Sequence, residues 1–445
     1  MLKIKIKNMN KTNFKILFLN SRFFLSAGII HLPLIIAYPA TILKLSGYNI
    51  KVIDLAIDNI PDKNLIQNIR EYNPNLVIIN SEATVLQTRN FFNALDLVKK
   101  VKNNFPKIDI AMTGAHVTFR DIETLERNPE ILFIIRHEPD YIVKDLVEAI
   151  VNKGNYSEIK GLTYRQRDKI IRNESREPIM KLDNLPCPDR TIFPIKKYLA
   201  KDNETTVQGG RGCINHCYFC QSSAFDRCIR LRSASSLVNE VKKTLRLGFK
   251  SIFFADLDFG ASEKRLKEFC EIIIREKIKF QWNANIRADR IKNTEAGIKL
   301  LKLMKKSGCF RLFIGFESIS KKILKNVKKE IVPNQLKEVA RLLNEHGINL
   351  HASFLFGLPG DTEATIKATV KFAKQINPQM VSFNILIPFP GTIIGDNPEK
   401  FGIKVIDKYW YEKSDCADKI LINNKKLTAK KLRDLGAWAY KELFS

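Results

Sequence analysis

The first third of the chain alternates short, uniformly apolar runs with amphipathic segments. The apolar runs lie at residues 15–20, 49–55, 75–80, 109–114 and 131–136. Runs of this length are typical of strands that are buried on both faces of a parallel sheet. Residues 90–105, between two of them, have the spacing of an amphipathic helix. The pattern predicts a doubly wound parallel sheet at residues 15–152, behind a flexible terminus at residues 1–14, with a ligand crevice at the carboxyl ends of the strands.

Residues 153–200 interrupt this rhythm. Residues 161–173 have the pattern of a small hairpin, and residues 180–194 are repeatedly punctuated by proline. We therefore interpret residues 153–200 as a linker between two domains.

A second series of alternating elements fills residues 201–400. Its candidate strands are residues 205–210, 251–259, 280–289, 310–318, 349–357 and 381–389. Gly248, Gly308 and Gly347 stand where the intervening helices would end, as C′ glycines do. Six right-handed β/α units predict a partial (β/α)6 barrel with its chemistry at the carboxyl ends of the strands. Residues 401–445 then form a carboxy-terminal helical extension.

Length and charge refine this picture. A chain of 445 residues predicts two or three domains. Its 74 basic and 47 acidic residues give a net charge of +27, which could serve nucleic acid or an anionic membrane. The basic runs lie on separate predicted helices, so we favour a compositional bias in which lysines solvate helix faces.

One segment resembles a membrane span. Residues 23–43 contain no Lys, Arg, Asp or Glu and are long enough to cross a bilayer. His31, Pro33 and Pro39, together with the strand pattern just before the segment, favour a buried loop and helix instead. The amino terminus shows no secretory signal. We expect a cytoplasmic protein without a transmembrane segment.

Three of the eight cysteines, Cys213, Cys217 and Cys220, fall within the stretch GGRGCINHCYFCQ at residues 209–221. Such a cluster indicates metal binding in a reducing compartment. A structural zinc site needs a fourth ligand, which His216 or Cys228 could supply. An iron–sulfur cube held by three thiolates instead leaves one iron open for another ligand.

The cysteine spacing, CxxxCxxC with an aromatic residue before the last cysteine, resembles the signature of the radical S-adenosylmethionine (SAM) enzymes. GFES at residues 315–318, FLFGLPGDTEAT at residues 354–365 and NILIPFPGT at residues 384–392 are similar to later strand segments of that superfamily. The resemblance implies a [4Fe–4S] cluster on the three cysteines, SAM on its open iron, and formation of a 5′-deoxyadenosyl radical.

The same resemblance implies which residues contact SAM. Phe219 would lie near the adenine, Glu317 would accept hydrogen bonds from the ribose, and Arg287 would pair with the methionyl carboxylate. The remaining candidates end the second and fifth strands: Asp256, Asp258 and Gly357. Structural roles remain open for these residues, such as a helix cap for Glu317, a surface ion pair for Arg287 and turn geometry for the glycine.

The amino-terminal domain resembles the cobalamin-binding domains that precede the radical domain in one class of these enzymes. The resemblance rests on residues 32–55, 79–84 (INSEAT), 113–119 (TGAHVTF) and 137–150. The Asp-x-His-x-x-Gly motif, whose histidine ligates cobalt in other cobalamin proteins, does not occur. A domain that keeps the fold without the ligand is the alternative. The candidates for the cobalamin crevice are Ser81, Thr84, Gly114, His116 and Glu138.

The sequence thus supports three hypotheses of function. The first is cobalamin-dependent methylation of an unactivated carbon of a small molecule, with electrons from a donor such as flavodoxin or ferredoxin and no nucleic acid partner. The second keeps these cofactors but carries out oxidative cyclisation, as in the anaerobic magnesium-protoporphyrin ester cyclases. The third is a zinc-stapled basic protein that binds RNA, which would leave the six β/α units unexplained.

Overall fold

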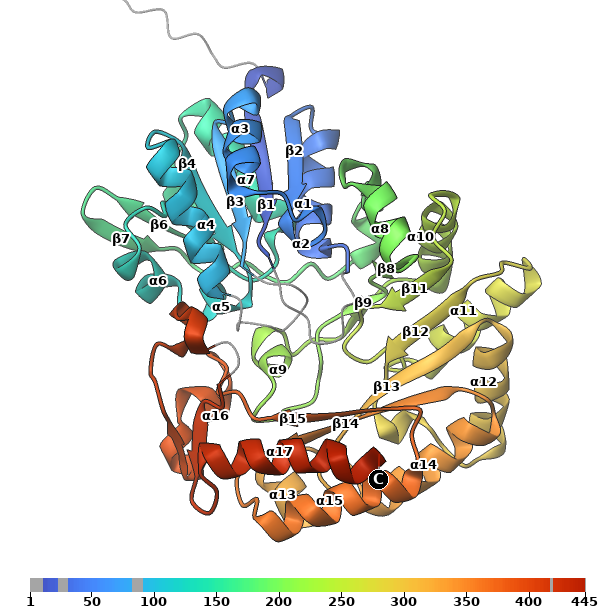
Figure 1. The fold of residues 1–445 in the computed structure, drawn as a ribbon. Coiled ribbons are helices and arrows are strands. Elements are labelled where there is room, and N and C mark those ends of the chain that lie inside the picture. Colours follow the sequence, from blue (N-terminus) through green and yellow to red (C-terminus); the bar gives the residue numbers. More distant parts are fainter. Residues whose placement is uncertain (1–10, 23–30, 82–90, 417–418, 445) are drawn as a thin grey trace, which may run out of the picture. The chain divides into compact units, whose positions relative to one another are not determined.

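The computed structural model describes residues 11–22, 31–81, 91–416 and 419–444, and it divides the chain into two compact units (Figure 1). Unit 1 comprises Met1–Met180 and Asn184–Asp202, and unit 2 comprises Lys181–Asp183 and Asn203–Ser445. Each unit is built around its own sheet. The two sheets confirm the predicted fold class, an α/β chain with two successive parallel sheets.

Unit 1 contains a seven-stranded sheet in the order β2-β1-β3-β4-β5-β6-β7. Its parallel strands are β1 (Lys15–Asn20), β2 (Asn49–Asp54), β3 (Leu76–Asn80), β4 (Asp109–Thr113) and β5 (Phe133–Ile135). Nearly every residue of β1 and β3 is buried, as their continuous apolar runs predict. The hairpin expected within the linker forms β6 (Leu162–Gln166) and β7 (Lys169–Arg172), which extend this sheet in antiparallel fashion.

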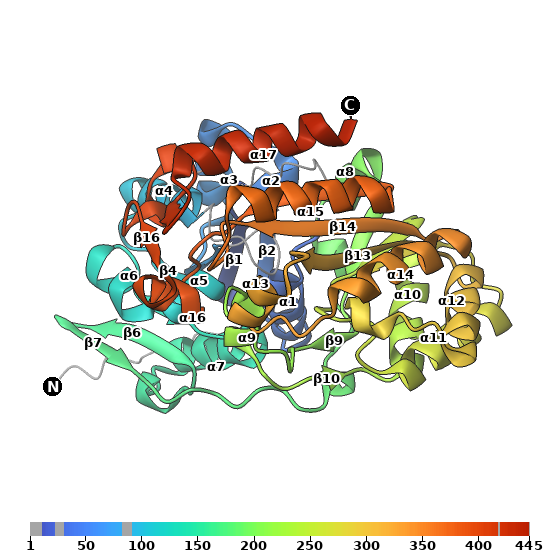
Figure 2. The same ribbon diagram turned by 90° about the horizontal axis from the view of Figure 1, so that it is seen from below.

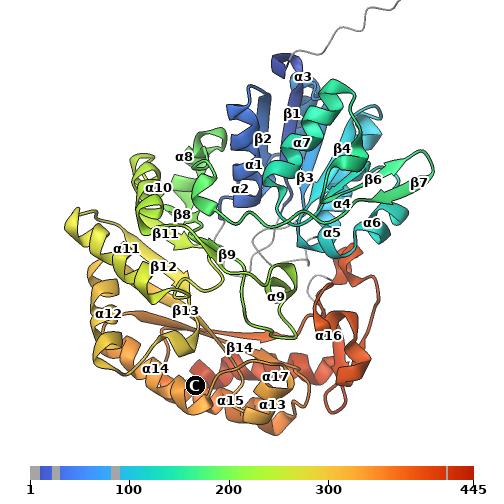
Figure 3. The same ribbon diagram turned by 180° about the vertical axis from the view of Figure 1, so that it is seen from behind.

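Helices cover both faces of this sheet, as a doubly wound fold requires. The helices α1 (Leu34–Leu45) and α7 (Pro139–Asn152) pack against each other on one face, and α3 (Asp62–Tyr72) and α4 (Phe91–Asn104) lie on the other (Figures 1 and 3). The shorter helices are α2 (Leu55–Asp58), α5 (Ala115–Phe119), α6 (Asp121–Arg127) and α8 (Ile195–Lys201).

The apolar segment that resembles a membrane span is only partly described. Its described part forms α1, which is 12 residues long and contains Pro39. Within the described ranges, no helix combines the length and apolar character needed to cross a bilayer.

Unit 2 contains a six-stranded, all-parallel sheet in the order β15-β14-β13-β12-β11-β8 (Figure 1; β13 and β14 are also labelled in Figure 2). Its strands are β8 (Glu204–Val207), β11 (Ser251–Phe254), β12 (Gln281–Asn285), β13 (Cys309–Glu317), β14 (Asn349–Phe356) and β15 (Met380–Ile385). Each follows its predecessor in chain order, so the sheet is the predicted series of β/α units. Two small hairpins accompany it, β9 (Gly210–Arg211) with β10 (Arg230–Leu231), and β16 (Ile403–Val405) with β17 (Ile422–Asn424).

Amphipathic helices connect these strands. They are α9 (Gln221–Phe225), α10 (Ala234–Arg246), α11 (Glu263–Arg275), α12 (Glu295–Lys306), α13 (Lys321–Asn326), α14 (Pro333–Glu345), α15 (Glu363–Ile376) and α16 (Ile393–Asp396). The last helix, α17 (Ala429–Phe444), packs on α15 and β15. At Gly308, between α12 and β13, φ is +101° and a Cβ atom would overlap the carbonyl oxygen of Phe280, which explains the predicted C′ glycine there.

The two faces of the unit 2 sheet differ in exposure. On β13 and β14 buried residues such as Leu312, Ile314 and Ala352 alternate with partly exposed residues such as Phe313 and His351. Because successive side chains of a strand point to opposite faces, one face packs on helices and the other stays accessible. The carboxyl ends of these strands meet at one edge, where the cysteine loop begins.

Candidate functional site

The cysteine loop lies between β9 and α9, just after the first strand of the unit 2 sheet. Cys217 is buried, whereas Cys213 and Cys220 are partly exposed. No disulfide joins any of the eight cysteines, all of which belong to the described residues. The backbone N–H of Cys220 donates to the carbonyl of Cys217 at 3.0 Å, and that of Cys213 donates to Asp226 at 3.0 Å. The loop therefore presents three thiols from a fixed backbone.

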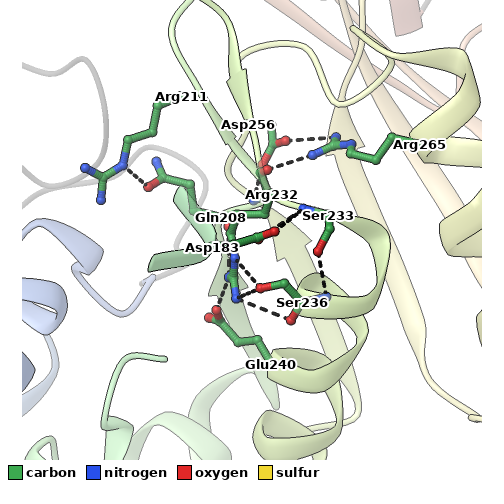
Figure 4. Close-up of polar contacts among 10 residues, drawn as sticks. Asp183, Gln208, Arg211, Arg232, Ser233, Ser236, Glu240, Asp256 and Arg265 are labelled. Carbon is green, nitrogen blue, oxygen red and sulfur yellow. Dashed lines mark hydrogen bonds and ion pairs between the residues drawn. The ribbon is translucent and has the colours of Figure 1, made fainter. Parts of the chain in front are cut away.

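The glycines before the loop lie close to a buried ion pair, Asp256 with Arg265, which Figure 4 shows. The N–H of Gly209 donates to Oδ1 of Asp256 at 2.6 Å, and its carbonyl accepts from Nη1 of Arg265 at 2.7 Å. Asp256 and Arg265 pair with each other at 3.2 Å. A Cβ atom on Gly209 would lie 2.9 Å from Arg265, and one on Gly210 would lie 2.6 Å from Leu231. A larger residue at either position would therefore have to displace a side chain packed against it.

A second set of contacts holds the strand after the loop (Figure 4). The N–H of Arg232 donates to the carbonyl of Gly209 at 2.8 Å, and its guanidinium pairs with buried Glu240 on α10. The same guanidinium donates to Oγ of Ser236 at 3.0 Å. Gly209, which precedes the loop, is thus hydrogen-bonded to Arg232, which follows it.

The middle of the loop is clamped by two further elements. The N–H of Tyr218 donates to the carbonyl of Val327, which ends α13, at 3.0 Å. The carbonyl of Tyr218 accepts from the N–H of Ile394 on α16, also at 3.0 Å. Its ring meets Phe401 edge-on with the centroids 5.7 Å apart. These contacts fix the backbone between Cys217 and Cys220 from both sides.

Charged side chains surround Cys217. Burial raises the pKa of this thiol to about 11, against the opposing effect of the Lys329 cation. Cys220 and Glu317 add to the rise, and the Arg287 cation also opposes it. These residues come from four separate segments of the chain, and Cys220, Arg287 and Glu317 among them were predicted to belong to the site. A thiolate ligand at this position needs the cations beside it or a metal centre to stabilise its charge.

Glu317 and Lys329 form an ion pair of 3.0 Å in which each side chain is 11% exposed. Glu317 has φ of +60° and follows a register shift between β13 and β14, which turns its side chain back over Gly315. A Cβ atom on Gly315 would overlap the Glu317 carboxylate, which explains the glycine of GFES. Glu317 thus lies beside the cysteine loop, as predicted, and its contact with the ribose stays a prediction.

Lys329 is the residue that sequence reasoning missed. It lies in a basic run that we interpreted as a solvated helix face, and its neighbours Lys325 and Lys328 are indeed exposed. Lys328 also lies beyond the end of α13, so this position does not distinguish the two lysines in the sequence; the ion pair of Lys329 with Glu317 does so in the structure.

The other predicted SAM residues lie near the loop but already have partners. Both oxygens of Asp256 contact the chain itself, so its observed role is to hold the start of the loop. Asp258 pairs with Arg290 at 3.0 Å, and Arg287 pairs with Asp289 at 2.9 Å. Contacts of these residues with SAM stay predictions. To make them, each side chain would have to bind SAM beside its present ion-pair partner or in place of it.

Phe219 and Gly357 complete the predicted set. Phe219 is partly exposed within the loop. Gly357 has φ of +82°, and the N–H of the next residue, Leu358, donates to Asp361 at 3.1 Å. Turn geometry alone accounts for this glycine.

The donor set fits an iron–sulfur cluster better than a single ion. Ligands of one zinc ion all lie about 2.3 Å from it when they are thiolates, whereas the thiolates on a [4Fe–4S] cluster each bind a different iron. Across the part of the chain that is described, no three His, Cys, Asp or Glu side chains converge on a single-ion site. Three thiols without a disulfide, on a rigid loop beside Lys329 and Glu317, therefore suit a cluster with one open iron.

In unit 1, four of the five predicted cobalamin residues lie at the carboxyl ends of β3 to β5, and Thr84 lies outside the described residues. Ser81 is buried and donates to the carbonyl of Thr113 at 3.0 Å. Gly114 has φ of +135° and begins α5. Glu138 accepts from the N–H of Ile179 at 2.9 Å. Ser81 and Glu138 thus have contacts inside unit 1, and their contact with cobalamin stays a prediction.

His116 is 1% exposed and stacks on Phe91 with the ring centroids 4.0 Å apart. Burial lowers its pKa to about 3, and the nearby Arg120 cation contributes to this shift. The imidazole is therefore neutral near pH 7. Its position inside the fold is that of a core side chain.

The sequence analysis missed a buried polar network at the ends of the first three strands of unit 1. The Asn80 amide donates to Asn20 at 2.8 Å, and the Asn20 amide donates to Asp54 at 2.7 Å. The hydroxyl of Tyr198, on α8, donates to the other oxygen of Asp54. This network covers the point where the strand order of the sheet reverses, which is where ligands bind in doubly wound folds.

Comparison with known proteins agrees with this geometry. The model of the Radical SAM superfamily matches residues 207–373, and the model of the B12 binding domain matches residues 23–147. The chain therefore carries a B12 binding domain ahead of a radical SAM domain. This assignment confirms the family predicted from the cysteine motif and the cofactor set of [4Fe–4S] cluster, SAM and cobalamin.

Relatives and solved structures match this chain to different extents. An uncharacterized methyltransferase of Pyrococcus horikoshii is 29% identical over 81% of this chain and 77% of its own. The anaerobic magnesium-protoporphyrin IX monomethyl ester cyclase of Cereibacter sphaeroides is 29% identical over 81% of this chain but only 59% of its own. The solved structure of the radical SAM methyltransferase TsrM from Kitasatospora setae has a TM-score of 0.73 at 17% identity, covering 88% of this chain and 78% of its own. At this identity TsrM shows a shared fold.

Proposed function

We propose that the protein is a cobalamin-dependent radical SAM methyltransferase that acts on an unactivated carbon of a small molecule. The observation that carries this proposal is the presence, in one chain, of a B12-binding domain and of a rigid loop with three thiols and no fourth cysteine ligand between its ends. The P. horikoshii relative, which is named a methyltransferase and is matched over most of its length, supports it.

The residues of the loop would hold the cluster and its ligand. Cys213, Cys217 and Cys220 would bind three irons and leave the fourth to SAM. When bound, the cluster supplies the electron that cleaves SAM to a 5′-deoxyadenosyl radical, and cobalamin supplies the methyl group. Glu317 would accept hydrogen bonds from the ribose hydroxyls, and the ion pair with Lys329 would hold that carboxylate in position.

The clamp on Tyr218 and the anchor at Gly209 would keep the thiols in place during the reaction. Both fix backbone atoms by hydrogen bonds at 2.6–3.0 Å. A fixed backbone would keep the three thiols at one spacing, as a preorganised set of metal ligands requires.

A second candidate is oxidative cyclisation with the same cofactors. The relatives named as cyclases favour it, since the C. sphaeroides cyclase and the P. horikoshii relative are each 29% identical to this chain. The chain spans only 59% of that cyclase but 77% of the P. horikoshii relative, so the methyltransferase is matched over more of its length.

Anaerobic turnover with isotopically labelled SAM distinguishes them. The reconstituted enzyme is incubated with SAM that carries a deuterated methyl group, a reductant, and the small-molecule extract of the cells that make the protein. We expect one compound to gain the labelled methyl group in place of a hydrogen, with 5′-deoxyadenosine formed alongside it, and no such product from the C217A variant. A product that forms in the same mixture without the label would refute methylation and favour cyclisation.

A further inference from the structure

The accessible face of the unit 2 sheet brings a cation, an imidazole and an aromatic ring together. Arg311 and Phe313 on β13 and His351 on β14 are partly exposed, whereas their neighbours along each strand are mostly buried on the opposite face. Phe313 and His351 are register partners. The centroid of the Phe313 ring lies 4.7 Å from that of His351 and 5.8 Å from the guanidinium carbon of Arg311. Arg311 and His351 thus both adjoin one ring.

Arg311 differs from the other arginines of this unit. The other buried or partly buried arginines that are described there each have a carboxylate or amide acceptor: Arg211, Arg230, Arg232, Arg265, Arg287 and Arg290. The guanidinium of Arg311 has no such partner among the described residues, and its Nε is enclosed. Glu204 instead accepts from Ser251 at 2.8 Å and, at 2.7 Å, from Asn283, the register partner of Arg311. An enclosed donor without an acceptor costs stability, and the acceptor of a ligand would remove that cost.

His351 has a second enclosed polar atom without a partner on the same face. Its Nε2 lies 2.7 Å from Oγ of Ser382, and its Nδ1 is enclosed and has no hydrogen-bond partner among the described residues. Burial lowers the pKa of His351 to about 4, to which the Arg311 cation contributes, so the ring is neutral near pH 7. When the Ser382 hydroxyl donates to Nε2, the ring proton lies on Nδ1 as a donor without an acceptor. Arg311 and His351 therefore both offer unused donors.

We propose that Arg311 and the Nδ1–H of His351 bind the anionic group of the substrate, and that the apolar part of the substrate lies on Phe313. The substrate class is then a small organic acid. The proposal rests on the proposed function and deepens it, because it names the substrate class of the same domain. An arginine forms paired hydrogen bonds with a carboxylate or a phosphate, so either group could supply the anion.

The position of Arg311 along its strand bears on the shape of this acid. Arg311 lies six residues before Glu317 on β13, and at about 3.3 Å per residue their Cα atoms are about 20 Å apart. Glu317 marks the carboxyl end of the strand, where the cysteine loop begins. The anionic group is therefore held toward the amino end of the strand, with the apolar part directed toward the loop, which favours an elongated acid over a short one.

The test measures the binding of three probes that share a phenylbutyl group to the reconstituted holoenzyme. The probes are phenylbutyrate, phenylbutyl phosphate and the neutral phenylbutanol, and ligand-observed NMR gives their Kd values. R311Q removes the cation, and H351F keeps a ring beside Phe313 but removes both ring nitrogens. R246Q is the matched control, because Arg246 lies exposed on α10 and its replacement removes the same charge.

We expect R311Q to bind phenylbutyrate at least about tenfold more weakly than the wild type does, since a hydrogen bond to a charged group is lost. H351F should weaken binding by a smaller factor, and R246Q should bind as the wild type does. Phenylbutanol should bind weakly and equally to all four proteins. The melting temperature of R311Q should not fall, because no internal partner is lost, whereas a purely structural role of Arg311 would lower it.

Unchanged affinity for both anionic probes in R311Q or in H351F, or no binding of either anion by the wild type, would overturn the proposal. Tighter binding of phenylbutyl phosphate than of phenylbutyrate, lost in R311Q, would support the site and assign a phosphate as the anion.

A separate measurement distinguishes this proposal from the proposed function. Formation of 5′-deoxyadenosine with dithionite and without substrate should be the same in the wild type and R246Q. If the wild type fails to cleave SAM under these conditions, the proposed function fails, while the Kd comparison still decides whether Arg311 and His351 bind an organic anion.

Discussion

At the scale of single residues, Asp54 is a carboxyl group that the fold encloses almost completely. Burial raises its pKa from 3.8 to about 6, although hydrogen bonds from Tyr198, Asn20 and the N–H of Ala56 oppose the rise. The carboxyl group therefore binds its proton more tightly in the folded than in the unfolded chain. Its contribution to the free energy of unfolding is largest at low pH, is lost between about pH 4 and pH 6, and is constant above that range.

The D54N variant isolates this effect. Asparagine keeps the shape but does not titrate, so the melting temperature of the wild type should fall relative to that of D54N from pH 4 to pH 6 and stay level above pH 6. A shift of about two pKa units corresponds to about 3 kcal/mol, or several degrees. Scanning calorimetry at a series of pH values measures it, with the exposed Asp168→Asn as the control that should show no such change. A difference that grows with pH would contradict the assignment.

Residues differ in how far the sequence reveals them. Cys213, Cys217 and Cys220 could be predicted because metal ligands are recognised by type and spacing within one loop. Lys329 and Asp54 could not, since their burial depends on partners 12 and 144 positions away. Asp256 was predicted to bind SAM because it ends a strand. In the structure its carboxylate accepts a hydrogen bond from the N–H of Gly209 and so holds the start of the cysteine loop.

At the scale of elements, the cysteine loop depends on Gly212, a glycine that is not part of the CxxxCxxC signature. Gly212, directly before Cys213, has φ of +81°, and a Cβ atom there would overlap the carbonyl oxygen of Cys228. The strand pair β9–β10 brings these two backbone segments together. The geometry of the first cysteine is thus set by the hairpin that closes the loop.

The G212A variant should lose most of its iron. The methyl group would push Cys213 away from the other two thiols, so the iron content after anaerobic reconstitution should fall well below that of the wild type. Gly47→Ala is the matched control, because Gly47 has φ of +87° but no atom within 4 Å of the added Cβ. It should cost about 1 kcal/mol in stability and leave the iron content unchanged. Equal iron content in G212A and wild type would show that the hairpin does not position Cys213.

At the scale of the whole molecule, both units follow from local patterns. Buried parallel strands and amphipathic helices have periods of a few residues, which is why every parallel strand of both sheets begins within two residues of its predicted start. The predicted ends are less accurate, since β11, β12 and β15 end four or five residues earlier than predicted. The hairpin β6–β7 was predicted as local structure, but its attachment to the edge of the first sheet depends on long-range pairing with β5. Part of the segment that we interpreted as a linker, residues 162–172, therefore extends the sheet of unit 1.

The central claim is that three thiolates, and not four, hold the cluster of this enzyme. Iron and sulfide analysis of the anaerobically reconstituted wild type, C217A and C228A proteins tests it most directly. Cys228 is the matched control, since it is exposed and lies just beyond the loop. We predict about four irons and four sulfides per chain in the wild type and in C228A, and loss of the cluster in C217A. One zinc without sulfide, or loss of the cluster in C228A, would contradict the account.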